Sequence, residues 1–352
     1  MTTDLLAELK SAAGSVDRII AESTFPKAVK PAYLAEAMRA YPANGGKRLR
    51  PAIMLWSAAA AGGNMQDILP AAAGLEIFHN WTLVHDDIID NDDARRGKPT
   101  AHIVLADFMP GNSKNNRKFG TDMAILAGDL MQGWAFELTD QSCVSAEVKL
   151  ELAKQLRYFG YIKLISGEAI DVAMSYQTSL PNIGELFEMQ SGKTGALLHY
   201  AARAGYMAGK NDPEAWNSPE AQALGNFGEY LALAFQVRDD YLGIFGNFEE
   251  FGKPIGSDLA EGKATLLLLH AMENLSADDK VQLQNLLYQE KYTPEMLEKA
   301  RKLFTASGSV EFVCNTISSM TLKAKNELEK LPETPARELL SKLADYLINR
   351  EK

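Results

Sequence analysis

Apolar residues recur at helical spacing along nearly the whole chain. The first stripe contains Leu5, Leu9, Val16 and Ile20, and an i, i+3, i+4 recurrence of this kind predicts an amphipathic helix. Similar stripes follow at residues 29–41, 51–62, 67–90, 121–139, 146–175, 184–209, 218–245 and 263–273. Alternating β-branched runs, which predict strands, are nearly absent. The pattern therefore predicts an all-α fold.

Composition limits the class of protein further. The chain has 352 residues, 46% of them hydrophobic, and no Ser/Gly-rich linker, so we expect a single domain over residues 1–352. A net charge of −10 argues against nucleic acid or an anionic membrane as the main partner. No apolar run reaches the roughly 18 residues of a transmembrane segment, and the N-terminus lacks a signal-peptide pattern. These features predict a cytoplasmic protein. Two cysteines cannot form a disulfide framework and are expected to be buried thiols.

An acidic pair occurs twice inside an apolar, helix-like run. The two segments, residues 83–90 and 235–243, read LVHDDIID and FQVRDDYLG. Ionised carboxylates beside apolar residues are costly unless a cation meets them. Mg²⁺ prefers oxygen ligands and usually lies between carboxylates and substrate phosphates. Two such clusters therefore indicate phosphate or diphosphate chemistry.

On an ideal helix the first segment forms one polar stripe. Asp86 and Asp90 lie within about 40° of each other, and His79 and Thr82 lie near the same face. Directly afterwards comes NDDARRGKP, residues 91–99, where the helix should end. Carboxylates followed by two arginines suit a diphosphate, because arginine binds such groups bidentately. The alternative is a solvated acidic face followed by a charged loop.

The second segment and the remaining basic clusters are weaker signals taken singly. Gly243 occupies the place of a third carboxylate after Asp239 and Asp240, and Lys253, Asp258 and Lys263 follow in a Gly/Pro-rich stretch. The run GGKRLRP at residues 45–51 is a plausible anion cradle. The run GKTG at 192–195 lacks the spacing of a P-loop. The run GEAID at 167–171 adds an acidic pair within a helix.

In this order, the five segments resemble those of the trans-isoprenyl diphosphate synthases, or polyprenyl synthetases, over roughly residues 40–275. The resemblance implies a helical bundle around a deep central cavity, acting as a homodimer. It implies a Mg²⁺-dependent head-to-tail (1′-4) condensation of isopentenyl diphosphate with an allylic diphosphate. The expected product is a short all-trans prenyl diphosphate, C15–C20.

The resemblance also implies roles for individual residues. Those expected to ligate or support three Mg²⁺ ions are Asp86, Asp87, Asp90, Asp239, Asp240 and Asp171, the last two indirectly. Those expected to bind the allylic diphosphate are Arg95, Lys193 and Lys253. The isopentenyl diphosphate pocket would contain Lys47, Arg50, His79 and Arg96. The dipoles of Thr194 and Gln236 would face the developing allylic cation.

Three features depart from the family pattern. Gly243 replaces the last aspartate of the second motif, Glu168 stands where the family commonly has glutamine, and residues 107–118 form a longer stretch than usual.

Bulky residues before the first aspartate set product length in this family, which implicates Trp81 and Thr82, with Phe78 as a deeper floor. The helical wheel places Trp81 about 140° from Asp86, so packing between helices is the alternative.

Other protein classes fit the sequence less well. A class I terpene cyclase would not need the second basic pocket, and a non-catalytic synthase subunit usually lacks aspartates that this chain retains. A metal-storage bundle predicts Glu-x-x-His pairs on facing helices, and none lies near the acidic segments.

Overall fold

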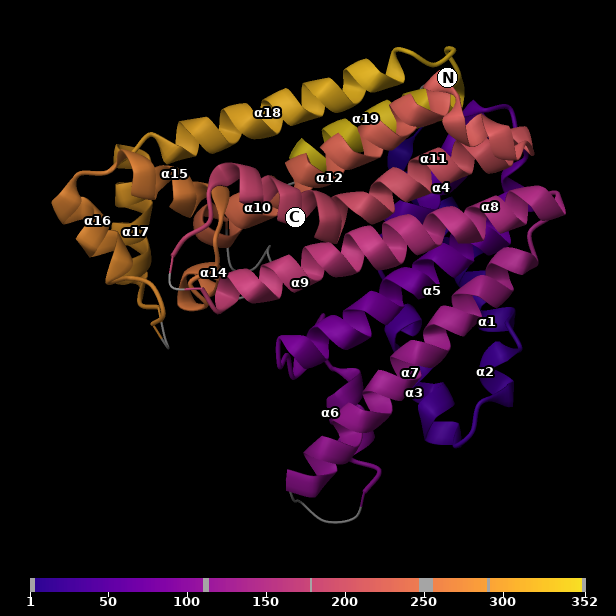
Figure 1. Ribbon diagram of the computed structural model, residues 1–352, viewed down its shortest axis with the longest axis horizontal. Coiled ribbons are helices and arrows are strands. Elements are labelled where there is room, and N and C mark those ends of the chain that lie inside the picture. The colour runs from indigo at the N-terminus through magenta and orange to yellow at the C-terminus, as the bar shows by residue number, and fades with distance from the viewer. Residues whose placement is uncertain (1–3, 110–113, 178, 247–255, 290–291, 350–352) are drawn as a thin grey trace. The chain divides into compact units, whose positions relative to one another are not determined.

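The computed structural model describes residues 4–109, 114–177, 179–246, 256–289 and 292–349 (Figure 1). The chain divides into two compact units. The first contains Met1–Lys154, Arg203–Ala221 and Thr334–Leu339, and the second contains Gln155–Ala202, Gln222–Glu333 and Leu340–Lys352. The expectation of one domain over residues 1–352 stays a prediction.

The described residues are helical almost throughout, which confirms the all-α prediction. The N-terminal helices are α1 (Leu5–Glu22), α2 (Phe25–Ala28), α3 (Ala32–Ala43), α4 (Leu49–Ala60), α5 (Met65–Ile89), α6 (Ala101–Ala106), α7 (Lys114–Asp140) and α8 (Ala146–Leu156). The middle ones are the π-helix η1 (Arg157–Lys163), α9 (Leu164–Ser175), α10 (Ile183–Gln190), the π-helix η2 (Ser191–Gly195), α11 (Ala196–Lys210), the 3₁₀ helix η3 (Pro213–Asn217) and α12 (Pro219–Phe245). The C-terminal ones are α14 (Ser257–Ala260), α15 (Leu266–Asn274), α16 (Ala277–Gln284), α17 (Pro294–Ala306), α18 (Ser309–Leu328) and α19 (Pro335–Asn349).

One two-stranded ladder interrupts the helices of the described chain. Strands β1 (Ala94–Arg95) and β2 (Lys98–Pro99) pair antiparallel. The two residues between them, Arg96 and Gly97, both have positive φ, 52° and 73°. That combination is typical of a type I′ turn, whose twist matches a β-hairpin. The sequence analysis predicted the end of the helix here but no strands.

In the first unit, α5 packs lengthwise against α7 (Figure 1). Glycine permits this approach, since a Cβ at Gly74 would lie 2.5 Å from the carbonyl oxygen of Ala135. At the other end of α5, the His85 ring lies against Gly128 and its Nε2 is 3.2 Å from the carbonyl oxygen of Ile125. The last turns of α5 are therefore held firmly, and these are the turns that carry the first acidic segment.

The second unit has its own apolar core. The buried residues Leu266, Leu267, Leu268 and Leu269 of α15 pack with residues of α10, α12, α17 and α18. The four-leucine run is therefore a core segment.

No helix among the described residues is long and apolar enough to cross a membrane. The prediction of two buried cysteines is wrong for Cys143, which is exposed because it follows α7 at the surface, and Cys314 is only partly buried.

Candidate active site

The first acidic segment forms the C-terminal end of α5. The helix ends at Ile89 with Asp90 as its C-cap, as the sequence predicted. Asp86 is partly exposed and Asp90 is exposed, whereas Asp87 is fully buried. Asp86 and Asp90 are therefore accessible from solvent, while Asp87 is committed to protein contacts.

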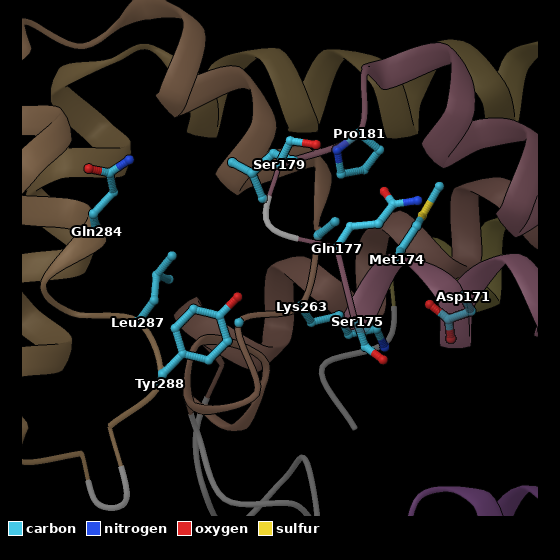
Figure 2. Close-up of a pocket in the computed structure, with 13 residues that line it drawn as sticks. Asp171, Met174, Ser175, Gln177, Ser179, Pro181, Lys263, Gln284, Leu287 and Tyr288 are labelled. Atoms are coloured by element: carbon cyan, nitrogen blue, oxygen red, sulfur yellow. The ribbon is translucent and has the colours of Figure 1, made fainter.

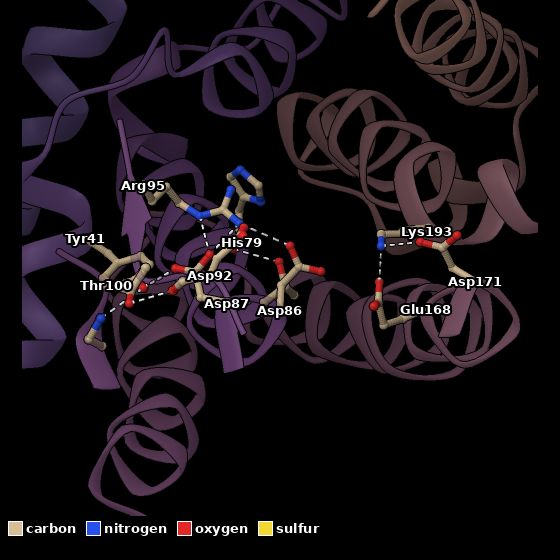
Figure 3. Close-up of polar contacts among 12 residues, drawn as sticks. Tyr41, His79, Asp86, Asp87, Asp92, Arg95, Thr100, Glu168, Asp171 and Lys193 are labelled. Atoms are coloured by element: carbon tan, nitrogen blue, oxygen red, sulfur yellow. Dashed lines mark hydrogen bonds and ion pairs between the residues drawn. The ribbon is translucent and has the colours of Figure 1, made fainter. Parts of the chain in front are cut away.

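Arg95 lies on the β1–β2 hairpin and binds back onto both aspartates (Figure 3). Its Nε donates to Oδ1 of Asp87 at 2.5 Å, and its Nη2 donates to Oδ2 of Asp86 at 3.2 Å. The hydroxyl of Tyr41 donates to the other oxygen of Asp87. The sequence analysis did not single out Tyr41, because its relation to Asp87 depends on the packing of α3 against α5.

A second group of cations in the first unit surrounds His79. Burial lowers the pKa of His79 well below its usual value, and the charges of Arg50 and Arg96 lower it further. The imidazole is therefore neutral at physiological pH. Burial, with the charge of Arg96, also lowers the pKa of Arg50 to about 10. The Nε of Arg50 is buried and has no hydrogen-bond partner among the described residues. The charge of Glu76 acts on both Arg50 and Arg96, but Glu76 is itself ion-paired with Arg48.

Arg48, two residues before Arg50, is bound to other groups of the protein. Its Nε bonds to Asp17 and its Nη1 to Glu76, each at 2.8 Å, and the side chain is almost completely buried. It also donates to the carbonyl oxygens of Pro42 and Gly45. Of the basic residues in the GGKRLRP run, Arg48 is therefore structural.

The glycine pair of the same run makes room for Arg96. A Cβ at Gly46 would lie 2.9 Å from Nη1 of Arg96, and that nitrogen donates to the carbonyl oxygen of Gly45. Lys47 is exposed. A cleft in the first unit is lined by Tyr41, Asn44, Asn80, Leu83, Arg95, Arg96 and Pro99.

In the second unit, the π-helix η2 presents Lys193. Its Nζ contacts Glu168 at 2.8 Å and Asp171 at 2.6 Å (Figure 3). A Cβ at Gly167 would lie 2.2 Å from the backbone nitrogen of Lys193, so only glycine lets α9 and η2 approach this closely. Single-turn π segments inside α-helices are frequent at functional sites.

The second acidic segment lies on α12, also in the second unit. The Oγ1 of Thr194 donates to Oε1 of Gln236 at 3.3 Å, and Nε2 of Gln236 donates to Asp240 at 2.9 Å. Asp240 is buried, which raises its pKa to about 7. Burial would lower the pKa of Lys263, but the carboxylates of Asp240 and Asp258 raise it instead. Asp239 is half-buried.

The structure gives a reason for glycine at position 243. A Cβ there would lie 3.0 Å from Oδ2 of Asp258, and the carbonyl oxygen of Gly243 accepts from the backbone nitrogen of Gly256 at 2.9 Å. Asp258 therefore brings a carboxylate to the place where the family motif has its last aspartate. The sequence shows both residues but not their proximity.

A pocket of about 200 Å³ lies beside these residues in the second unit (Figure 2). Asp171 and Lys263 line it together with the ring of Tyr288. Gly262 admits the ring, because a Cβ there would lie 2.1 Å from it. The pocket therefore adjoins the carboxylates and cations described above.

The residues expected to control product length lie on α5. Phe78 and Trp81 are both buried and pack edge to face, with their ring centroids 4.7 Å apart. The centroid of the Trp81 ring also lies 5.8 Å from that of His85, on the side of α5 that faces α7. Thr82 is half-buried and donates to the carbonyl oxygen of His79 at 2.8 Å.

Parts of two expectations fall outside the described residues. Lys253, expected to bind the allylic diphosphate, lies outside them, and so do residues 110–113 of the long 107–118 stretch. Within the described ranges no group of three or more His, Cys, Asp or Glu residues is arranged to hold a metal ion.

Comparison with known proteins identifies the family. The polyprenyl synthetase model matches residues 31–304. A short-chain isoprenyl diphosphate synthase of Methanothermobacter thermautotrophicus is 36% identical over 309 residues, which are 87% of each chain. The chain therefore belongs to the polyprenyl synthetase family, and it is an enzyme of the prenyltransferase class.

Solved structures agree with this assignment. Geranylgeranyl pyrophosphate synthetase from Pyrococcus horikoshii has a TM-score of 0.86 at 34% identity, covering 98% of both chains. Geranylgeranyl pyrophosphate synthase from Corynebacterium glutamicum, complexed with isoprenyl diphosphate and magnesium, has a TM-score of 0.83 at 28% identity, covering 99% of this chain and all of that one. The predicted family and fold class are confirmed.

Proposed function

We propose that the protein condenses isopentenyl diphosphate with an allylic diphosphate, head to tail, to give an all-trans C15–C20 prenyl diphosphate and free diphosphate. The observation that carries this proposal is the pocket around His79. The charges of four arginines act on His79 there, the Nε of Arg50 has no hydrogen-bond partner among the described residues, and His79 lies on the same helix as the carboxylates of Asp86 and Asp90. One unit thus offers a metal-free anion site as well as carboxylates, which suits two diphosphate substrates bound in different ways.

The carboxylates fit magnesium. Asp86 and Asp90 present accessible oxygen donors without a preformed cage of three ligands in the described part of the chain. Mg²⁺ is usually bound by one or two carboxylates plus substrate phosphates rather than by an all-protein cage. We propose that Asp86 and Asp90 hold two ions and Asp239 a third, with Asp240 and Asp171 acting through water. Bound Mg²⁺ would neutralise the charge that develops on the leaving diphosphate.

The basic side chains bind the two substrates. Arg95, Lys193 and Lys253 bind the allylic diphosphate, whose carbon–oxygen bond breaks at C1. Arg50, Arg96, Lys47 and neutral His79 hold isopentenyl diphosphate so that its C4 attacks that carbon. The product double bond forms as a proton leaves C2 of the isopentenyl unit, and the departing diphosphate accepts it.

Thr194 and Gln236 have a role at the reacting carbon. Nε2 of Gln236 donates to Asp240, and its Oε1 accepts from the Thr194 hydroxyl, so the two oxygens lie side by side and each keeps a lone pair. Oxygen dipoles preorganised in this way would stabilise positive charge on the allylic fragment.

A product assay tests the proposal. Purified protein, Mg²⁺ and labelled isopentenyl diphosphate are incubated separately with dimethylallyl, geranyl and farnesyl diphosphate, and the dephosphorylated alcohols are sized by chromatography. We expect C15 or C20 alcohols. Hydrocarbons formed from an allylic substrate alone would indicate a terpene cyclase. Activity that appears only with a second protein would indicate a non-catalytic subunit.

Trp81→Leu is expected to lengthen the products beyond those of the wild type. Removing the indole opens space beside Phe78 on the side of α5 that faces α7, where we propose that the growing chain ends. The measurement is the alcohol length distribution at equal turnover. Trp56→Leu, which empties a similar volume in α4 of the same unit, is the control and should leave the length unchanged. An unaltered distribution in Trp81→Leu would place the floor elsewhere.

We propose that the enzyme is a homodimer formed through α7, where Ile125 and Leu126 are 42% and 47% exposed. Sedimentation equilibrium should give twice the chain mass of 38.6 kDa. Leu126→Lys should shift the protein toward monomer, because a charge placed in a buried apolar interface is costly. Leu322→Lys on α18, where the leucine is 61% exposed, is the control. A monomeric wild type contradicts this proposal but leaves the chemistry untouched.

A further inference from the structure

The buried carboxylate of Asp87 has one partner on each oxygen. Nε of Arg95 donates to Oδ1 at 2.5 Å, and the hydroxyl of Tyr41 donates to Oδ2 (Figure 3). Asp87 is fully buried, so water does not replace a lost donor. The orientation of the carboxylate, and with it the direction in which Arg95 is held, therefore depends on the Tyr41 hydroxyl.

The same hydroxyl is attached to a third element. It accepts a hydrogen bond from the backbone nitrogen of Ala101 at 3.2 Å. Ala101 is the first residue of α6 and follows the hairpin that carries Arg95. The hydroxyl therefore donates to Asp87 and accepts from Ala101 at the same time. One oxygen thus links α3, the end of α5 and the segment after the hairpin.

We propose that Tyr41 is a positioning residue for Arg95 and acts through Asp87. It fixes the guanidinium in the direction needed to bind the allylic diphosphate. This inference rests on the proposed function, because it takes Arg95 to be an allylic-diphosphate ligand. Phenylalanine at position 41 would leave one oxygen of Asp87 without a donor, and the carboxylate would turn to share Arg95 differently.

A purely structural tyrosine would behave differently from a positioning one. Loss of a structural contact lowers the amount of folded enzyme, and it affects the kinetic constants for both substrates equally. Loss of positioning at Arg95 raises the KM for the allylic substrate selectively, since Arg95 is hydrogen-bonded to Asp87 whereas Arg96 is held by the carbonyl oxygen of Gly45.

Tyr41→Phe is therefore tested by steady-state kinetics with each substrate varied in turn. We expect the KM for the allylic diphosphate to rise about five- to twentyfold while that for isopentenyl diphosphate stays within about twofold. Tyr33→Phe removes the same atom from the same helix, where the ring packs against Phe108 and Phe119, and should leave both constants unchanged. Equal changes in both KM values for Tyr41→Phe would overturn the inference.

A double-mutant cycle tests whether Tyr41 acts through Arg95. In an Arg95→Met background, Tyr41→Phe should cause no further loss in calorimetric binding of an unreactive allylic thiodiphosphate. Full additivity of the two losses would overturn the inference. If the wild-type protein binds the analogue yet forms no prenyl product, the proposed function fails instead. The binding comparison then still decides the role of Tyr41.

Discussion

Asp86→Asn should lower kcat by about a thousandfold or more while the protein stays folded. The substitution keeps the shape of a partly exposed side chain but removes its charge. Metal ions supply several kcal/mol of transition-state stabilisation, and about 4 kcal/mol corresponds to a thousandfold in rate. Because Asp86 also accepts from Arg95 at 3.2 Å, some weakening of allylic-substrate binding should accompany the loss of turnover.

The measurement is steady-state turnover over a range of Mg²⁺ concentrations. Thermal unfolding of both proteins is followed alongside. The Mg²⁺ concentration that gives half-maximal activity should be higher for the variant than for the wild type. The variant should unfold near the wild-type temperature. Asp67→Asn makes the same change in the first turn of α5 and should leave turnover unchanged. A kcat for Asp86→Asn within tenfold of wild type would contradict the metal role.

Arg50→Met is expected to raise the KM for isopentenyl diphosphate by about ten- to a hundredfold. Hydrogen bonds to charged groups contribute about 1.5–3 kcal/mol, and each 1.4 kcal/mol is a factor of ten in affinity. The KM for the allylic substrate should change by less than about twofold, because Arg95 keeps its contacts with Asp86 and Asp87.

The same variant makes a second prediction, about stability. Arg50 is partly buried beside Arg96, and its buried Nε has no hydrogen-bond partner in the described part of the chain, so Arg50→Met should leave the melting temperature unchanged or raise it. Arg48→Met, two residues away, should destabilise the protein by about 3–5 kcal/mol, because it breaks the buried ion pair with Glu76. Differential scanning calorimetry compares the two variants. A drop for Arg50→Met as large as that for Arg48→Met would show that Arg50 is structural.

That contrast marks a limit of sequence reasoning. Arg48 and Arg50 lie in one basic run, and nothing in their spacing distinguishes them. Arg48 has φ of +48°, and this backbone turn directs its side chain toward Asp17 and Glu76. The sequence can therefore indicate an anion pocket without showing which cations remain to serve it.

Gly243 illustrates the same limit at the second acidic segment. In the sequence it is a missing carboxylate; in the fold it leaves room for Asp258, which follows fifteen residues later. Likewise, the helical wheel separated Trp81 from Asp86, and the structure places Trp81 on the side of α5 that faces α7. That position agrees with the wheel and leaves the role of Trp81 in product length as a prediction.

By itself the sequence determined the helical class, the C-terminal end of α5 and the alignment of Asp86 with Asp90, because each depends on the 3.6-residue period or on local chain signals. Order and spacing of the segments also determined the family. Tertiary structure alone decided that Tyr41 donates to Asp87 and that Asp258 lies beside Gly243. It also decided that Arg48 is structural while the Nε of Arg50 has no partner among the residues the structure describes. These pairings join residues far apart in the chain. They follow from the way helices pack, and a local periodicity carries no information about that.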